Sequence, residues 1–569
     1  MPTIEIKTKS DNMKRTLFVV TASLVMSVFI TSLTSCSESV VSIRDFGVRP
    51  NTGKDVTADF NKALLQCREK GVRVLHLEAG VYDFWPENAA RREIFVSNTS
   101  SETECPSKIK TIGLLLEDQH NLTIEGNGAE LIFHGKQTMM AVIHSSGIKI
   151  RNLHIDCERP GASEMLVEKV DPNAVFLRFN KSSWYEIAPE GKLELVGEGW
   201  KTEYPHCIEY DAETGHMTYS TNWNIVQNSH AEEIEKGLVK IQTDEAASFK
   251  EGDILTVRDR IRDQVGILNL ESEDLEFEDM GIHSLHAIGV VSQFCRNLSF
   301  RNVNFEPCEG SGRILASSAD FLHFSGCAGK VKVEGCRFSG AQDDCINIHG
   351  TYLVLDEIVS EKQLKLRFAH HQTYGMKAFW SGDTIAFVNR NSLQTLAVAV
   401  VDSVCRLSDR EVLLTVNQAV PSEIQEDEFA IENLTWTPEV EIAGNHFTRT
   451  STRGTLITTP RKSVIKDNVY DKVGMSGIFV SGDANNWFES GAVKDLTICN
   501  NRFIDCAYNN GSKGAAILIE PTNTIDEAPV HGTIRIISNQ FESESKEPVV
   551  YKSVRELVFE ENSVPNGEQ

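Results

Sequence analysis

Three aspartates stand at a spacing that suits acid–base chemistry. Asp343 and Asp344 are adjacent in the run Ala341-Gln-Asp-Asp-Cys-Ile-Asn-Ile-His-Gly350, and Asp320 lies 23 residues before the first and 24 before the second. In a chain that repeats with such a period, the three carboxylates would converge on one face. Like charges held close together raise at least one pKa. A carboxylic acid whose pKa is raised can protonate a leaving glycosidic oxygen, while an ionised neighbour takes a proton from water.

Two other interpretations of these aspartates remain open from the sequence. Aspartate is a common turn residue, so the adjacent pair and Asp320 could each mark a turn. Carboxylates also suit Ca²⁺, although no further set of ligands accompanies them. The coil-length spacing favours catalysis over a turn role, and the lack of a further ligand set in the sequence ranks a metal site below catalysis. We therefore expect Asp320, Asp343 and Asp344 to be catalytic, without a metal ion and without a cofactor.

The elements that must position the aspartates recur along the chain. Each short strand pattern has an apolar residue, two arbitrary residues, a variable fourth residue and an apolar residue two further on. Fixed periods of this length indicate stacked repeats. Three pairs of successive copies are 23 residues apart, namely Phe277 and Phe300, Ile442 and Ile465, and Ile536 and Phe559.

The repeats predict an all-β fold, a right-handed single-stranded parallel β-helix with inserted small β-barrel or sandwich domains. They contain strands and turns rather than the leucines of a leucine-rich repeat, and a propeller needs about twice this period. Successive coils would stack at the spacing of strands, ~4.8 Å. Asparagine tolerates left-handed backbone at a tight turn and can bond its neighbours in a ladder. The fourth position is asparagine in the last five copies, at Asn445, Asn468, Asn501, Asn539 and Asn562.

Two interruptions of the period define the predicted domains. Val333 and Ile442 are 109 residues apart, so one coil of 23 leaves 86 inserted residues. Insertions on one face of a repeat protein commonly shape its binding face. A helix over about Thr57 to Lys70 would cover the open end of the first coils. The predicted parts are a signal peptide (1–36), an N-terminal cap with the first coils (40–159), an inserted β domain (160–262), the coils with the aspartates (263–350), an inserted β-barrel or sandwich (351–436) and the C-terminal coils (437–564).

Candidate substrate-binding residues follow from the same spacing. Arg453 lies 109 residues after Asp344, so it should sit about one coil above the aspartates. There it could bind sugar hydroxyls and tune the carboxylate pKa values, although a structural arginine fits the sequence as well. Further along, Trp487 could stack on a sugar ring, with Glu489 or Asn485 bonding hydroxyls, unless this is a loop with a packed tryptophan. Weaker candidates are Trp380 and Trp436, and His349 is expected to support the structure.

The N-terminus predicts export. An apolar run from Leu17 to Leu33 follows Lys14 and Arg15, and it ends in Leu33-Thr-Ser-Cys36. This pattern is typical of a secretory signal ending in a lipobox, with Cys36 as the lipidated residue, rather than of a permanent membrane anchor. We expect an exported bacterial lipoprotein of the outer membrane, on its periplasmic or cell-surface face. The true start could be Met13.

Charge and cysteine content exclude several functions. The formal net charge of −25 disfavours nucleic acid and acidic polysaccharides, because phosphate or uronate binding needs a basic surface. Of the 13 cysteines, 12 remain without Cys36, and none forms a CxxC pair with zinc spacing. We expect them to be buried small hydrophobic residues rather than a disulfide framework.

These residues resemble a known family. The Asp45-Phe-Gly47 stretch and the Gln342-Asp-Asp-Cys345 run are similar to the pectinase-type β-helix group. The three aspartates, the inserted barrel and the run from Thr452 to Lys462 resemble glycoside hydrolase family 110. That resemblance implies an inverting, metal-independent exo-α-1,3-galactosidase that removes terminal galactose, including that of the blood group B determinant. It also implies Asp343 as the general acid, with Asp320 and Asp344 as the base pair that activates water.

Two alternatives to this interpretation are a polygalacturonase and a non-catalytic surface protein. A polygalacturonase shares the fold and an aspartate triad, but its Gly-His-Gly and Arg-Ile-Lys runs are missing, and Ser318-Ala-Asp320 replaces Asn-Thr-Asp. A non-catalytic surface β-helix that binds carbohydrate would need aromatic platforms and no acid–base set. The expected partners are a glycan with terminal α-1,3-galactose and, through the lipid anchor, a membrane. Whether the chain forms a homo-oligomer stays open.

Overall fold

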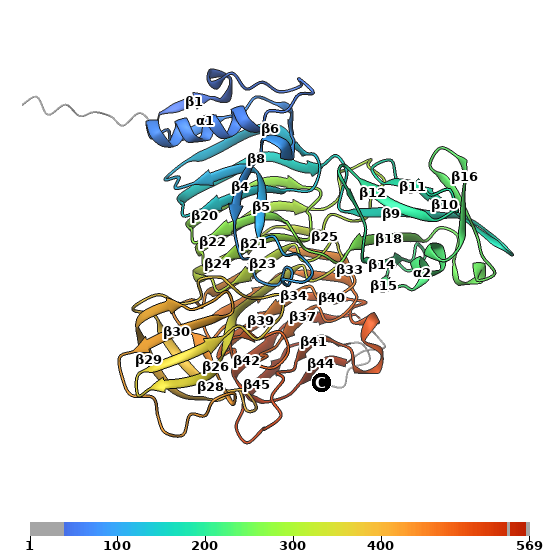
Figure 1. Cartoon of the computed structure of the whole chain (residues 1–569). Helices are drawn as coiled ribbons and strands as arrows, with labels where there is room; N and C mark the ends of the chain where they lie inside the picture. Colours follow the sequence, from blue (N-terminus) through green and yellow to red (C-terminus); the bar gives the residue numbers. More distant parts are fainter. Residues whose placement is uncertain (1–38, 543–546, 565–569) are drawn as a thin grey trace, which may run out of the picture. The chain divides into compact units, whose positions relative to one another are not determined.

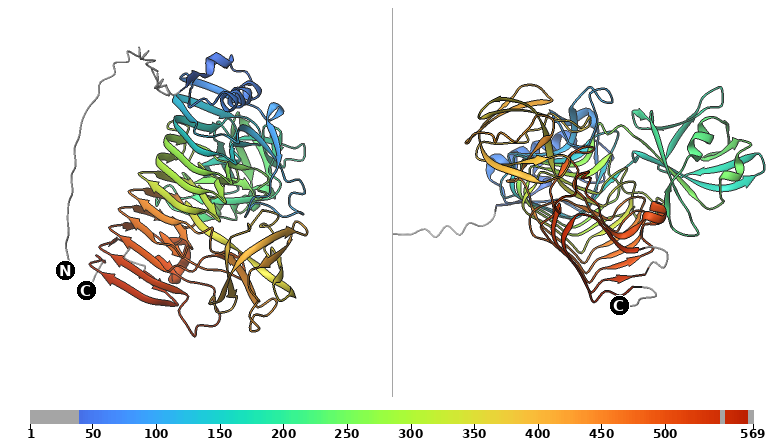
Figure 2. Two further views of the ribbon diagram at one scale, coloured as in Figure 1. Left: turned by 90° about the vertical axis from the view of Figure 1, so that its left-hand side faces the viewer. Right: turned by 90° about the horizontal axis from the view of Figure 1, so that it is seen from below.

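The computed structural model describes residues 39–542 and 547–564 and shows a right-handed parallel β-helix (Figure 1). The predicted signal peptide and its Cys36 lie outside the described residues. Three ladders of parallel strands form the walls of the β-helix, and Figure 2 shows their coils stacked one on another. The predicted fold class is confirmed.

The first two ladders share their long early strands. The first contains β1 (Val40–Ser42), β2 (Val74–His76), β6 (Thr123–Phe133), β8 (Ser146–Cys157), β20 (Glu273–Ile282), β22 (Arg296–Phe305), β24 (Ala328–Glu334), β32 (Glu439–Ala443), β35 (Ser463–Lys466), β39 (Asp495–Cys499), β42 (His531–Ile537) and β45 (Val554–Glu560). The second begins at β3 (Gly80–Phe84), includes β6, β8, β20 and β22, and continues through β25 (Arg337–Ala341), β33 (His446–Thr450), β36 (Val469–Val473), β40 (Arg502–Ile504) and β43 (Gln540–Phe541).

The third ladder carries the aspartates at one edge. It contains β5 (Ile109–Glu117), β7 (Thr138–Ile143), β19 (Val265–Leu270), β21 (Ile288–Gln293), β23 (Leu322–Ser325), β26 (Ile346–Ser360), β34 (Thr455–Ile457), β37 (Ile478–Val480), β41 (Ala515–Ile519) and β44 (Glu547–Tyr551). A short strand, β4 (Ala90–Glu93), pairs with β5 in the antiparallel direction.

The predicted period is the register of the coils. Phe277 pairs with Phe300, Ile442 with Ile465, and Ile536 with Phe559. Val333 pairs with Ile442 across the second insertion, as the 109-residue offset requires. Inside the coils, aromatic rings stack at 4.6–5.0 Å between centroids in an unbroken column. The members of the column are Phe305, Phe338, Phe447, Tyr470, Phe503 and Phe541.

The asparagine ladder is present, with one correction to its backbone. The side-chain amide and backbone N–H of Asn445 donate to Oδ1 of Asn468 at 2.9 Å, and the pattern continues through Asn501 and Asn539 to Asn562. The left-handed conformation was expected at these asparagines, and that expectation is wrong. The residue before each one adopts it instead, as at Gly444 with φ 66° and Asp467 with φ 57°. This arrangement leaves the asparagine itself free to point inward and bond the next coil.

The N-terminal helix α1 spans Thr57–Lys70, as predicted. It buries Phe60, Ala63, Leu64 and Cys67, and the side chain of Asn61 bonds the backbone of β5 at both Gly113 and Leu115. The helix therefore supplies hydrogen bonds to a strand edge that would otherwise be open. The other helical elements are α2 (Asn222–Gln227) and the 3-10 turns η1 (Ile43–Phe46), η2 (Pro86–Asn88), η3 (Ala246–Ser248) and η4 (Tyr508–Lys513).

The first insertion forms its own antiparallel sheet with its own hydrophobic core. Its seven strands are β9 (Ala162–Asp171), β10 (Ala174–Phe179), β14 (Pro205–Tyr210), β15 (Met217–Tyr219), β16 (His230–Glu235), β17 (Leu238–Gln242) and β18 (Ile254–Asp259). A separate three-stranded sheet contains β11 (Trp184–Ile187), β12 (Leu193–Gly197) and β13 (Trp200–Lys201).

The second insertion is a closed antiparallel β-barrel. The long strand β26 leaves the third ladder and enters the barrel, where it pairs with both the first and the last inserted strand. The other barrel strands are β27 (Gln363–Arg367), β28 (Thr384–Asn389), β29 (Thr395–Arg406), β30 (Glu411–Val416) and β31 (Phe429–Asn433). Because one strand belongs to both structures, the barrel is attached directly beside the aspartates.

The cysteines are distributed as small buried residues rather than as a framework. Among residues 39–542 and 547–564, the structure contains twelve cysteines, all with free thiols. Eight of them are buried, two are partly exposed and two are exposed.

Candidate active site

The predicted catalytic residues occupy equivalent places on three successive coils. Asp320 lies two residues before β23, Asp344 two residues before β26, and Arg453 two residues before β34. Leu322 pairs with Ile346, and Ile346 pairs with Thr455. The offsets of 24 and 109 residues are therefore the true register, and one edge of one ladder presents all these side chains.

A small polar cavity of about 70 Å³ lies over this edge. Its lining combines four carboxylates with two guanidinium groups, a histidine, two amides and a tryptophan. The lining residues are Asn98, Arg262, Ile288, Asp320, His323, Asp343, Asp344, Asn347, Arg453, Leu456, Trp487 and Glu489.

Asp344 is held by Arg453. Nε of Arg453 donates to Oδ1 of Asp344 at 2.7 Å, and the backbone N–H of Arg453 donates to the same oxygen at 3.2 Å. Burial raises the pKa of Asp344 to about 7, against the opposing charge of Arg453. Burial alone would lower the pKa of Arg453, but Asp344 and Asp343 together raise it. We place the negative charge of this pair on Asp344, because its Oδ1 accepts two hydrogen bonds at the cation.

Asp343 bridges the two arginines at the mouth of the cavity. Its Oδ2 accepts from Arg262 at 3.2 Å, and its Oδ1 lies 4.0 Å from Nη2 of Arg453. The Asp343 side chain keeps 27% of its surface exposed, whereas Asp344 is almost completely buried. Asp343 is therefore the aspartate of this cluster that a ligand entering from solvent meets first.

Asp320 lies deeper and contacts a histidine. Its Oδ2 is 2.8 Å from Nδ1 of His323, and both side chains are buried. Burial, reinforced by the charge of Asp343, raises the pKa of Asp320 to about 8. At neutral pH Asp320 therefore keeps its proton while Asp344 is ionised. Two neighbouring carboxyl groups of the cluster thus differ in protonation at rest.

Two of the predicted substrate-binding residues reach the cavity from the segment that ends in β38 (Glu489–Ser490), which pairs with β26. Glu489 accepts a hydrogen bond from Asn98 at 2.9 Å. Trp487 is 46% exposed, and its ring lies 4.6 Å from that of His370 in the barrel. The exposed ring therefore stands at the rim of the cavity, where a sugar could stack on it.

Other predicted candidates lie elsewhere. Asn485 is absent from the cavity lining, since its amide donates to the carbonyl of Arg390 and its backbone N–H bonds Asp483. The Asp483 turn therefore holds Asn485 away from the cavity lining, and substrate binding by Asn485 stays a prediction. Trp380 and Trp436 pack on each other at 4.9 Å and on Phe294, so they fill the base of the barrel.

Several residues of the site were not predicted from the sequence. Arg262 follows the first insertion, and the arginine-rich run from Arg258 to Arg262 was the available signal. Asn98 comes from the loop between β4 and β5 and exchanges hydrogen bonds with Thr373 of the barrel. Oδ1 of Asn347 is buried and has no hydrogen-bond partner among the described residues, so it is available to a ligand.

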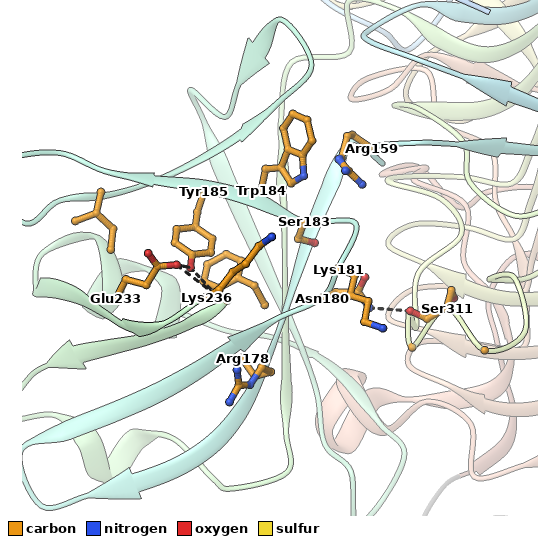
Figure 3. Close-up of a pocket in the computed structure, with 15 residues that line it drawn as sticks. Arg159, Arg178, Asn180, Lys181, Ser183, Trp184, Tyr185, Glu233, Lys236 and Ser311 are labelled. Atoms are coloured by element: carbon orange, nitrogen blue, oxygen red, sulfur yellow. Dashed lines mark hydrogen bonds between the residues drawn. The ribbon is translucent and has the colours of Figure 1, made fainter. Parts of the chain in front are cut away.

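A wider hollow of about 1230 Å³ lies beside the first insertion (Figure 3). Trp184, Arg159 and Lys181 line it, and Asn180 donates across it to the carbonyl of Ser311. Glu233 is the single carboxylate in its lining, and it bonds the hydroxyl of Tyr185. Because hydrolysis needs two cooperating carboxyl groups, size does not identify the reactive site in this molecule.

Two further observations concern the described part of the chain. Within residues 39–542 and 547–564, no cluster of three or more His, Cys, Asp or Glu side chains is arranged to hold a metal ion. Within the same ranges, no helix is both long and apolar enough to span a membrane.

Both insertions match known domain families. Residues 163–255 match the GLAA-B beta-barrel domain I, and residues 363–429 match the GLAA-B beta-barrel domain II. Among solved structures, the A-module of the mannuronan C-5 epimerase AlgE4 from Azotobacter vinelandii is similar at 11% identity and a TM-score of 0.41, covering 92% of this chain and 94% of that chain.

Curated relatives are similar along nearly the whole chain. Alpha-1,3-galactosidase A of Bacteroides fragilis is 46% identical over 93% of this chain and 88% of its own length. Alpha-1,3-galactosidases A and B of Bacteroides thetaiotaomicron are 36% and 31% identical, over 91% and 93% of this chain and 89% and 86% of their own lengths. The chain therefore belongs to the α-1,3-galactosidase family of glycoside hydrolases.

Proposed function

We propose that this chain is an exo-acting, inverting glycosidase that removes terminal α-1,3-linked galactose from glycans such as the blood group B determinant. The observation that carries the proposal is the convergence of Asp320, Asp343 and Asp344 on one small cavity, in a chain of this family. A small cavity suits the end of a glycan chain better than the interior of a polymer.

The three aspartates divide the reaction between them. Asp343, at the mouth, protonates the glycosidic oxygen as the bond to the leaving sugar breaks. Asp320 and Asp344, deeper in the cavity, take a proton from the attacking water on the opposite face of the sugar. Arg453 and Arg262 hold the carboxylates and offer N–H groups to sugar hydroxyls. Glu489 and the free Oδ1 of Asn347 provide acceptors for other hydroxyls.

A hydrolysis screen tests the substrate. Purified protein is incubated with a B-type trisaccharide, a linear α-1,3-digalactoside and polygalacturonate, and the released sugars are identified. We expect galactose from one or both α-1,3-galactosides and no product from polygalacturonate. Release of galacturonate would favour a polygalacturonase, while sugar binding without any hydrolysis would favour a non-catalytic carbohydrate-binding protein.

Inversion predicts the anomer of the first product. Water attacks from the face opposite the leaving group, so an α-galactoside should release β-galactose. Proton NMR during the first minutes of the reaction distinguishes the anomers before they equilibrate. Initial α-galactose would instead show retention and would remove the proposed role of the base pair.

Trp487 predicts a binding effect. Replacing Trp487 by Ala should raise KM about fivefold with little change in kcat, since ring stacking contributes about 1 kcal/mol. Trp184 is a matched control, because it is similarly exposed, 41% against 46%, but lines the other hollow. Steady-state kinetics on an α-1,3-digalactoside should therefore show no change in KM for Trp184→Ala. Equal effects of both substitutions would contradict a role of Trp487 in binding the substrate.

The proposal includes export and lipid attachment at Cys36. The support is the charged, apolar and lipobox-like order of residues 14–36. Labelled palmitate should enter the protein in a bacterial host and should be lost in Cys36→Ser. Equal labelling of both proteins would rule out this anchor. In a separate experiment, protease treatment of intact cells shows whether the protein faces the periplasm or the outside.

A further inference from the structure

A buried chain of hydrogen bonds extends from Asp320 away from the cavity. Nδ1 of His323 is 2.8 Å from Oδ2 of Asp320, and Nε2 of His323 is 3.0 Å from Nε2 of His349. Nδ1 of His349 is 2.6 Å from the carbonyl oxygen of Gly350. The two rings are 1% and 2% exposed, so the chain of contacts is shielded from solvent.

Each of these three contacts must contain one proton. The carbonyl of Gly350 can only accept, so Nδ1 of His349 must carry a hydrogen. Two ring nitrogens at 3.0 Å form a hydrogen bond only if one of them, and not both, is protonated. The contact between Asp320 and His323 likewise needs one proton. The trio therefore holds three protons, whereas an ionised aspartate with two neutral histidines holds two.

Two arrangements satisfy this count. In the first, Asp320 is a carboxylic acid that donates to Nδ1 of His323, and His323 donates through Nε2 to His349. In the second, Asp320 is ionised, His323 donates to it, and His349 is an imidazolium. Burial lowers the pKa of His349 and lowers that of His323 to about 4, which favours the first arrangement at rest.

We propose that His323 and His349 are positioning residues that take over the proton of Asp320 during the reaction, an inference that rests on the proposed function. The Oδ2–H bond of Asp320 breaks as the Nδ1–H bond of His323 forms. The Nε2–H bond of His323 breaks as the Nε2–H bond of His349 forms. Oδ1 of Asp320 then accepts a proton from the attacking water, whose O–H bond breaks as the hydroxyl joins the sugar.

The surroundings of the rings suit this transfer. The charged groups that face the two rings are Asp320, Asp343, Asp344, Glu489 and Arg262. Oε1 of Glu489 lies 3.6 Å from Nε2 of His349 and stabilises the imidazolium when it forms. Asp320 can thus act as a base beside two other carboxylates without releasing its proton into water.

The substitution His349→Gln separates proton transfer from structure. A glutamine amide can still bond Nε2 of His323, but it cannot become a cation. In this variant Asp320 ionises only by losing its proton to solvent, which its raised pKa opposes. We expect kcat/KM near pH 6 to fall on the order of 10²-fold, with the acid limb of the pH profile displaced upward and activity partly recovered near pH 9. KM should change little, because His349 lies behind Asp320.

His531→Gln is the matched control, because His531 is fully buried and belongs to β42, outside the cavity lining. We expect its pH profile to match that of the wild type. A profile of His349→Gln that is unchanged, or lowered equally at every pH, would overturn the relay and leave His349 with a structural role.

Imidazole ¹⁵N NMR of wild-type protein tests the resting proton arrangement, from which the transfer starts, without any activity measurement or variant. At pH 7 we expect His323 to be protonated at Nε2 and His349 at Nδ1. Protonation of His323 at Nδ1 with both rings neutral would contradict the proton count. If the wild type releases no galactose while the spectra show the expected tautomers, the proposed function and the transfer during the reaction fail, and only the resting proton arrangement of the trio stands.

Discussion

Asp343→Asn is expected to lower kcat for an α-1,3-digalactoside by about 10³-fold while leaving KM nearly unchanged. The amide has almost the same shape as the carboxyl group and can still accept from Arg262, but it cannot deliver a proton to the leaving oxygen. A sugar is a poor leaving group without that proton. The measurement is steady-state release of galactose by wild type and variant under identical conditions.

The leaving group identifies the acid. With 4-nitrophenyl α-galactoside, whose phenolate departs without protonation, the loss caused by Asp343→Asn should shrink to about tenfold. The same comparison for Asp320→Asn should show equal losses on both substrates, because a base is needed whatever the leaving group. If Asp320→Asn is rescued by the good leaving group and Asp343→Asn is not, the two roles are reversed. Asp59→Asn, an exposed substitution on α1, controls for loss of a surface charge.

The register of the β-helix could be predicted because the same spacing recurs along the sequence. Identical spacings at Phe277 and Ile442 fix the coil length, and a stacked strand has one residue opposite each residue of its neighbour. From that length alone, Asp320 is predicted to lie beside Asp344, with Arg453 one coil further along the β-helix. The asparagine ladder was predictable for the same reason, although its left-handed turn was assigned one residue too late.

The remainder of the site could not be predicted because most of its residues lie outside the repeating coils. Asn98 belongs to the loop between β4 and β5, and Arg262 belongs to the return from an insertion. Asn98 contacts Glu489, which lies hundreds of residues away, and Arg262 contacts Asp343. The period of the repeat relates neither pair. His323 lies within the repeat, on the face of its strand opposite to the core residues Leu322 and Phe324. A single histidine in an apolar strand has no sequence signal that separates a structural role from a chemical one.

The raised pKa of Asp320 makes a second prediction, for stability. Its pKa is about 8 in the folded protein against 3.8 in an exposed chain. Below about pH 4 both states are protonated, and the group contributes its full stability. As the pH rises from 4 toward 8, the unfolded chain releases the proton while the folded protein retains it, so the folded state loses stability. The wild type should therefore be progressively weakened by this residue across that window.

Asp320→Asn removes the titration while keeping the contacts, because its amide can donate to Nδ1 of His323 as the protonated carboxyl does. We expect the inactive variant to be more stable than the wild type by about 1–3 kcal/mol at pH 7, with the difference vanishing near pH 4. Urea unfolding across this pH range measures it, and Asp59→Asn should show no comparable trend. A variant less stable than the wild type at pH 7 would contradict the prediction. A residue that weakens the fold where the protein works, and whose replacement strengthens it, is held at Asp320 by chemistry and not by packing.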